Sequence, residues 1–147
     1  MTDLARVREW LLTFPLINRL KGLKVDYYST QLDNSSIAPS GLQEISRKTD
    51  ILGNVEVKNQ YNFSLEFVLT KAPGDDVGAE ENADWLLEFQ RWVQGQSIRK
   101  LVPTFGDEPT TETIKAQNGS NTYADNEGNA VYTVLLSINF TKKYEVS

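Results

Sequence analysis

The chain has 147 residues, 39% of them apolar and 10% aromatic, which is enough for one well-buried core and predicts a single domain over residues 1–147. It contains neither cysteine nor histidine, which excludes disulfides, thiolate chemistry, thiolate metal sites and histidine-based acid–base catalysis. The net charge of -5, with lysine and arginine scattered along the sequence, argues against specific binding to nucleic acid.

The first predicted element is an amphipathic helix from Thr2 to Phe14. Its apolar residues recur at steps of three and four, which places them on one side of a helix. Thr2 is the predicted N-cap, and Pro15 ends the helix. Trp10 falls beside the apolar stripe, so we expect an exposed aromatic side chain of the kind that is enriched at protein interfaces.

The following segment predicts a strand, a loop and a second, weaker strand. Lys24–Leu32 contains valine, tyrosine and threonine and is predicted to be a strand. Asp33–Gly41 is rich in asparagine, serine and proline and is predicted to be a loop. Leu42–Ile51 alternates weakly and is predicted to be a strand, with Ile45 and Ile51 as its apolar anchors.

The clearest strand pattern runs from Asn54 to Thr70. Apolar and polar residues alternate along it with a period of two, so one face of the strand should be buried and the other should face water or a partner. Strands of this length are uncommon, and we therefore expect a bend or bulge near Asn59 and Gln60.

A turn-rich linker, Ala72–Asp76, leads into a second amphipathic helix from Glu80 to Gln94. Its apolar face carries two tryptophans for which core packing is predicted, and Gly95 is the predicted terminator. Pro103–Pro109 is predicted to be irregular, and the chain should end in a long hairpin. The two strands of this hairpin are Thr111–Tyr123 and Ala130–Tyr144.

These elements together predict an α+β fold. The sheet should be mainly antiparallel, or mixed, with the N-terminal helix and the central helix packed on one of its faces. The sequence has no run of about 18 apolar residues, so no membrane span is predicted.

The sequence offers no catalytic, cofactor-binding or metal-binding residues. The acidic run Gly74–Glu81 lacks the spacing of a calcium loop, and there is no phosphate-binding loop or nucleophile elbow. A carboxylate pair such as Glu88 and Glu112 would suit a hydrolase, but nothing in the sequence places the two together. We therefore predict a protein that is not an enzyme and takes no cofactor.

Four stretches of the chain resemble the small "minor capsid" or tail-terminator proteins of phages and prophages that infect Gram-positive bacteria. The stretches are Asn59–Leu69 (NQYNFSLEFVL), Asn82–Ser97 (NADWLLEFQRWVQGQS), Pro103–Gly106 and Asn129–Tyr132. The resemblance is one of order and spacing, and it covers Leu52 to Tyr144.

The resemblance implies a structural virion protein in the tail or neck, assembled in the cytoplasm of the bacterial host. Such proteins form a hexameric ring that caps the tail tube, stops its polymerisation and offers a surface for joining the head. The implied partners are further copies of the chain, the tail tube protein, the neck or head-connector protein and, in a contractile tail, the sheath, with DNA passing through the ring. The resemblance does not distinguish a protein of an infectious phage from one of a phage-derived bacteriocin.

Two other functions stay open at this point. One is a head-completion or minor capsid protein bound at the portal, and the other is an unrecognised enzyme or small-molecule-binding domain. Seven residues in predicted loops, termini or exposed positions are the candidate interface: Trp10, Asp75, Asp76, Phe105, Asp107, Lys142 and Lys143.

Overall fold

The computed structural model describes residues 2–17, 23–25, 35–70, 76–124 and 129–145. In chain order the elements are α1 (Asp3–Leu11), β1 (Leu23–Val25), β2 (Ser35–Thr49), β3 (Val55–Thr70), α2 (Asp76–Ile98), a 3₁₀ turn (Pro109–Thr111), β4 (Thr113–Ala124) and β5 (Asn129–Tyr144). The five strands form one sheet in the order β1-β2-β3-β5-β4. The predicted α+β fold is confirmed: β1 pairs with β2 in parallel, and every other pairing in the sheet is antiparallel.

The centre of the sheet is the pair β3 and β5. These strands are in register without interruption, from Val55 opposite Tyr144 to Thr70 opposite Asn129. Because the side chains of a strand alternate between two faces, this register places the apolar residues of both strands on the same face of the sheet. The predicted alternation along β3 and β5 is thereby confirmed.

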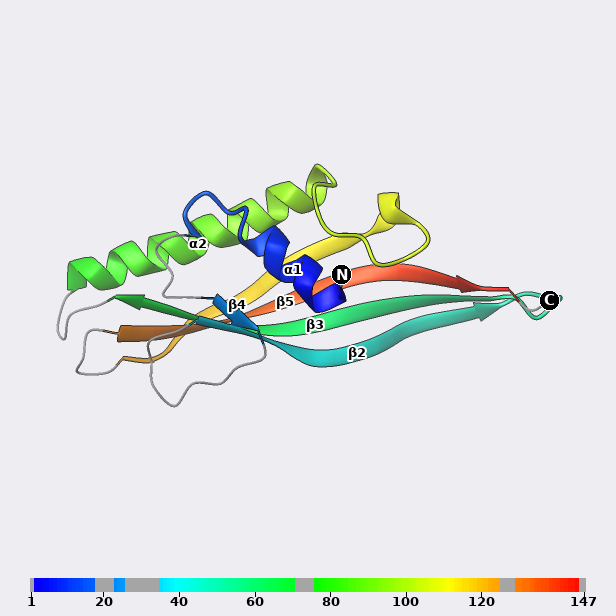
Figure 1. Cartoon of the computed structure of the whole chain (residues 1–147), viewed down its shortest axis with the longest axis horizontal. Coiled ribbons are helices and arrows are strands. Elements are labelled where there is room, and N and C mark those ends of the chain that lie inside the picture. The colour runs from blue at the N-terminus through cyan, green and yellow to red at the C-terminus, as the bar shows by residue number, and fades with distance from the viewer. Residues whose placement is uncertain (1, 18–22, 26–34, 71–75, 125–128, 146–147) are drawn as a thin grey trace.

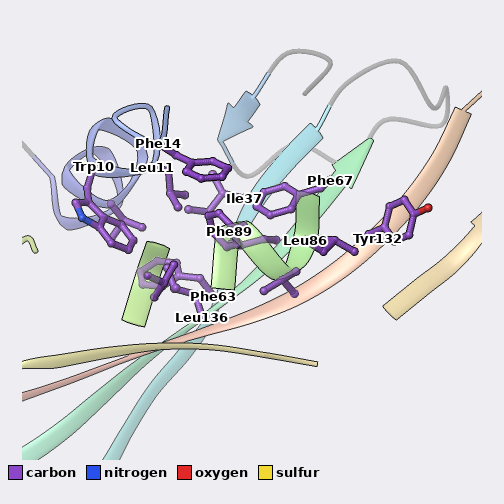
Figure 2. Packing of buried hydrophobic residues seen from close by; sticks show 14 of the residues in the cluster. Trp10, Leu11, Phe14, Ile37, Phe63, Phe67, Leu86, Phe89, Tyr132 and Leu136 are labelled. Carbon is purple, nitrogen blue, oxygen red and sulfur yellow. The ribbon is translucent and has the colours of Figure 1, made fainter. Parts of the chain in front are cut away.

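Both helices lie on that apolar face (Figure 1). Figure 2 shows the side chains of α1 and α2 pointing toward the strands. The ring of Phe67 on β3 meets Trp85 and Phe89 of α2 edge to face, at centroid distances of 5.4 and 5.1 Å. Phe14, just after α1, meets the same two rings of α2 in edge-on contacts, so one aromatic cluster joins both helices to the sheet.

The N-terminal helix begins as predicted and ends earlier. The Thr2 hydroxyl accepts a hydrogen bond from the Ala5 backbone N–H, which confirms the N-cap. The helix ends at Leu11, and the chain continues in turns through which Phe14 still reaches the core. Phe14 lies beyond the end of the helix but is still buried, so the apolar spacing continues past Leu11. This is why the spacing predicted a longer helix.

The central helix is longer than the predicted Glu80–Gln94. It runs through Gly95, so the prediction that this glycine ends it is wrong. The helix ends three residues later, at Ile98, and just beyond it the Leu101 N–H donates to the Gln96 carbonyl and Lys100 takes a left-handed backbone, with φ of 59°. This is a Schellman-type end built on lysine, the side chain of which donates to the Glu112 carbonyl.

The prediction of a loop over Asp33–Gly41 is wrong for residues 35–41, which begin β2. Ser35 is buried, and its hydroxyl accepts a hydrogen bond from the Val68 N–H of β3. Pro39, which has no N–H, lies beyond the three residues of β2 that pair with β1, in a part of the strand where no second neighbour is described. Pairing with β3 therefore outweighs a composition that is typical of loops.

Three predicted segments lie largely outside the described residues. Of the predicted strand Lys24–Leu32, only residues 24 and 25 are described, and they belong to β1. Residues 72–75 of the predicted linker and residues 125–128 of the predicted hairpin turn are likewise not described.

The irregularity predicted near Asn59 and Gln60 is found on the partner strand. Along β2 the register shifts between Glu44 and Ser46, which pair with Asn59 and Lys58, so Ile45 is an extra residue on that strand. A second shift lies at Ser40, next to Gly41, whose φ of 112° suits a bulge. The extra residues lie on β2, and the pairing of β3 with β5 is uninterrupted.

Tyr61 of β3 ties the N-terminus of α1 to the sheet and gives a prediction for alkaline pH. Its hydroxyl donates to an Asp3 carboxylate oxygen at 2.6 Å, and burial, together with this carboxylate, raises the pKa of Tyr61 to about 12 from 10.0. A raised tyrosine pKa means that the folded protein disfavours the phenolate. The stability contributed by Tyr61 is therefore complete below pH 10 and is lost as the pH rises toward about 12.

We expect a Tyr61→Phe variant to lose less unfolding free energy than the native chain over that pH range, as measured by urea unfolding. In an ultraviolet titration of tyrosinate, Asp3→Asn should lower the pKa of Tyr61 only in part, because burial is the larger cause. Equal alkaline losses in the native chain and the Tyr61→Phe variant would contradict the assignment.

Candidate interaction surface

The loop between α2 and β4 brings together two of the residues predicted at an interface. The Asp107 N–H donates to the Thr141 carbonyl, and an Asp107 carboxylate oxygen accepts from the Lys143 N–H, each at 2.7 Å. Phe105 packs its ring against Tyr61 and Phe140. Because β4 begins opposite Asn139, this loop occupies the edge of β5 that β4 leaves uncovered.

Glu112 holds this loop in place, a structural role that the sequence did not reveal. The residue is fully buried, and its two carboxylate oxygens accept hydrogen bonds from the N–H groups of Phe105 and Gly106. A carboxylate held by backbone donors fixes the loop against the end of β4. Glu88, which the sequence suggested as a partner for Glu112, instead forms an exposed ion pair with Arg91.

The remaining charged candidates differ in their surroundings. Lys143 forms an ion pair with Glu108 at 2.7 Å, and the Glu108 carboxylate that accepts its hydrogen bond raises the pKa of the ammonium group. Lys142 is half-buried beside it on β5. Asp75 lies outside the described residues, and Asp76 is the first residue of α2.

The expectation that Trp10 is exposed is wrong. Only 7% of the residue is accessible, and its ring stacks on Trp92 of α2 with centroids 4.8 Å apart. The indole N–H donates to the carbonyl of Leu101, 91 positions later in the chain. The segment after α2 thus covers a position that the helical pattern alone places at the rim, so Trp10 belongs to the core (Figure 2).

The end of the sheet projects beyond both helices, at the end marked C in Figure 1. We call residues 39–54, which comprise the outer part of β2 and the turn to β3, the arm. Every residue from Pro39 to Leu52 is exposed. The arm is therefore held by strand pairing, with no helix packed over it.

Four large aliphatic side chains of the arm face water. Their exposed fractions are 58% for Leu42, 51% for Ile45, 101% for Ile51 and 75% for Leu52. The prediction that Ile45 and Ile51 anchor the strand in the core is wrong, because the core ends before the arm begins. Exposed aliphatic side chains on a projecting element are typical of a protein-binding surface.

The tip of the arm is a turn with a fixed shape. One carboxylate oxygen of Asp50 accepts from the N–H groups of Leu52 and Asn54, and the other accepts from the Asn54 side-chain amide. The hydrogen bond from the Asn54 backbone is the largest cause that lowers the pKa of Asp50. Gly53 supplies the positive φ of 88° that the turn requires. Ile51 and Leu52 are thus presented in a defined orientation.

The outer edge of β2 is poorly suited to accept another strand. Pro39 lacks an N–H, the bulges at Ser40 and Ile45 interrupt the edge, and Arg47 and Lys48 add charge. Proline, bulges and charged residues are features by which natural sheets discourage pairing between edges. The side chains of the arm are consequently a better candidate for a contact than its backbone.

A second candidate surface is a groove of 690 Å³ between the C-terminal half of α2 and the start of β4. We call it the α2–β4 groove. Its apolar walls include Leu87 and Ile98 of α2, and Ile114 and Ala116 of β4 lie on the strand side. Of the residues predicted at an interface, Trp10, Phe105, Asp107, Lys142 and Lys143 have described side chains, and none of these lines the groove. The sequence pattern predicts β4 and α2 separately, but it does not show which exposed residues of α2 lie next to β4. The groove therefore could not be predicted from the sequence.

Comparisons with known proteins give no assignment: the sequence matches no protein-family model, and a search of curated proteins finds no match. Within the described parts of the chain, no three acidic side chains are grouped so as to hold a metal ion. No helix among these residues is both long and apolar enough to cross a membrane.

Proposed function

We propose that this chain is a structural subunit that associates with copies of itself, and that the assembly is a ring which caps the end of a phage tail tube. The observation that carries the proposal is the arm, with four large aliphatic side chains in water on a projecting end of the sheet. The resemblance of residues 52–144 to tail terminators in order and spacing supports the specific form of the assembly.

The energy available from the arm favours a ring over a simple pair. Burial of a large aliphatic side chain contributes about 1.5–3 kcal/mol, whereas association of two proteins costs roughly 4–15 kcal/mol. A single arm contact is therefore weak. In a closed ring each subunit has two neighbours, and a tube end that holds several subunits together raises their effective concentration.

The function is tested first on the purified chain and then on particles. Native mass spectrometry should give a hexamer, or a monomer that becomes a ring when isolated tail tubes are added. A chain that stays monomeric and never binds tube ends would rule out the proposal.

Electron microscopy of particles assembled without the protein then separates the two virion functions. Loss of a terminator should give abnormally long tails, or tails that fail to join heads. Normal tails beside leaking heads would instead identify a head-completion protein at the portal.

A further inference from the structure

The tip of the arm and the α2–β4 groove have complementary apolar surfaces. The groove has exposed Leu87 and Ile98 on its helix side, and its volume of 690 Å³ lies within the range of sites that enclose small ligands. The tip offers Ile51 and Leu52, the two aliphatic side chains of the arm that are most exposed. Their shapes are also complementary, since the groove is concave and the turn projects.

The charges of the two surfaces are also complementary. Arg91 and Lys115 line the groove, and no carboxylate is among its described lining residues. Arg91 forms an ion pair with Glu88, while Lys115 is exposed on β4. Asp50 carries a carboxylate at the tip, directly beside Ile51. Lys115 therefore gives the strand side of the groove a positive charge, which fits a partner with two aliphatic side chains and one carboxylate.

The tip is also prepared for binding. The hydrogen bonds of Asp50 to Leu52 and Asn54 fix the turn before any contact forms. Less conformational freedom is then lost on association, which favours a small contact.

From these observations we infer that the tip of the arm of one copy docks into the α2–β4 groove of a second copy. The inference rests on the proposed self-association and names the surfaces that carry it. Tip and groove are different parts of one chain, so the contact is heterologous and leaves a free tip on one copy and a free groove on the other. Repetition of such a contact generates a ring when the rotation closes.

The absence of native cysteine allows a direct test by disulfide trapping. A Leu52→Cys variant and a Leu87→Cys variant are mixed and oxidised, and the product is examined by non-reducing electrophoresis and mass spectrometry. We expect the mixed dimer as the dominant product. A chain that carries both substitutions should give a ladder of covalent oligomers that ends at a closed ring.

The matched control is Leu12→Cys, which replaces the leucine directly after α1, outside the groove, with an exposed fraction of 41% against 48% for Leu87. Mixed with Leu52→Cys, it should give no more dimer than random collision produces. Trapping of Leu52→Cys with the control as readily as with Leu87→Cys would overturn the inference, and so would the absence of any mixed dimer.

The same material separates this inference from the proposed function. If the native chain forms rings but Leu52→Cys and Leu87→Cys do not cross-link, the copies associate through other surfaces, and only the tip–groove contact fails. The thiol of Leu52→Cys can also be tested for protection from a thiol reagent. If a tail tube protein protects it and a second copy of the chain does not, the tip binds the tube, and the occupant of the groove is not this chain. If the native chain neither assembles nor binds tubes, both the tip–groove contact and the proposed function fail.

Discussion

Replacement of Phe89 by alanine is expected to lower the free energy of unfolding by about 3–5 kcal/mol. Phe89 of α2 is fully buried, and its ring contacts Phe14 after α1 and Phe67 on β3. It also lies between the two tryptophans of its own helix, at centroid distances of 6.0 and 6.2 Å. Deletion of the ring leaves a cavity at the point where both helices meet the sheet, and the four aromatic rings around it cannot all shift to fill it.

Urea unfolding followed by tryptophan fluorescence measures this loss. The control is Leu87→Ala, two positions away on the same helix, where 48% of the residue is exposed and about 0.5 kcal/mol is expected. Similar losses for the two variants would mean that α2 does not dock on the sheet through this cluster.

The regular parts of the fold could be predicted because their periodicity is local. The alternation along β3 and β5, the three- and four-residue spacing of the helices and the N-cap at Thr2 each depend on residues close in the sequence. A period of two or 3.6 fixes which side chains share a face, and the face is then buried as a unit. The fold class follows from the order of these elements.

The start of β2 could not be predicted, because a distant strand determines it. Ser35, Ser36 and Pro39 are typical of a loop, yet the first two are buried where the strand pairs with β3. The hydrogen bond from Val68 to the Ser35 hydroxyl joins residues 33 positions apart. Tertiary pairing of this kind is what local propensity omits.

The candidate interface was predicted less well, for the same reason. Trp10 is covered by Leu101 and Trp92, and Glu112 is buried by a loop that folds back on it. Neither contact leaves a signal in the local pattern. The arm did leave one: Leu42, Ile45 and the adjacent pair Ile51-Leu52 do not keep a period of two. Aliphatic residues without a regular period are consistent with a surface that is apolar but not part of the core.

The loop that covers the edge of β5 provides the second large effect. In a Gly106→Ala variant the new Cβ would lie well inside van der Waals contact of the Thr141 carbonyl oxygen, and 3.0 Å from the carbonyl carbon and nitrogen of that residue. These atoms belong to the backbone of a paired strand, so the loop must move instead. It then loses the hydrogen bonds between Asp107 and β5, and the packing of Phe105. We expect a loss of about 2–4 kcal/mol.

Gly95→Ala is the matched control, because nothing lies within 4 Å of a Cβ added at that position in α2. It should stabilise the helix by about 0.8–1 kcal/mol, since alanine favours a helix interior more than glycine does. Amide hydrogen exchange locates the damage: the Lys143 N–H, which donates to Asp107, should exchange faster in Gly106→Ala and unchanged in Gly95→Ala. Unchanged protection of Lys143 in both variants would show that the loop does not seal this edge. Faster exchange there, with a new tendency to aggregate, is what release of an unpaired strand edge predicts.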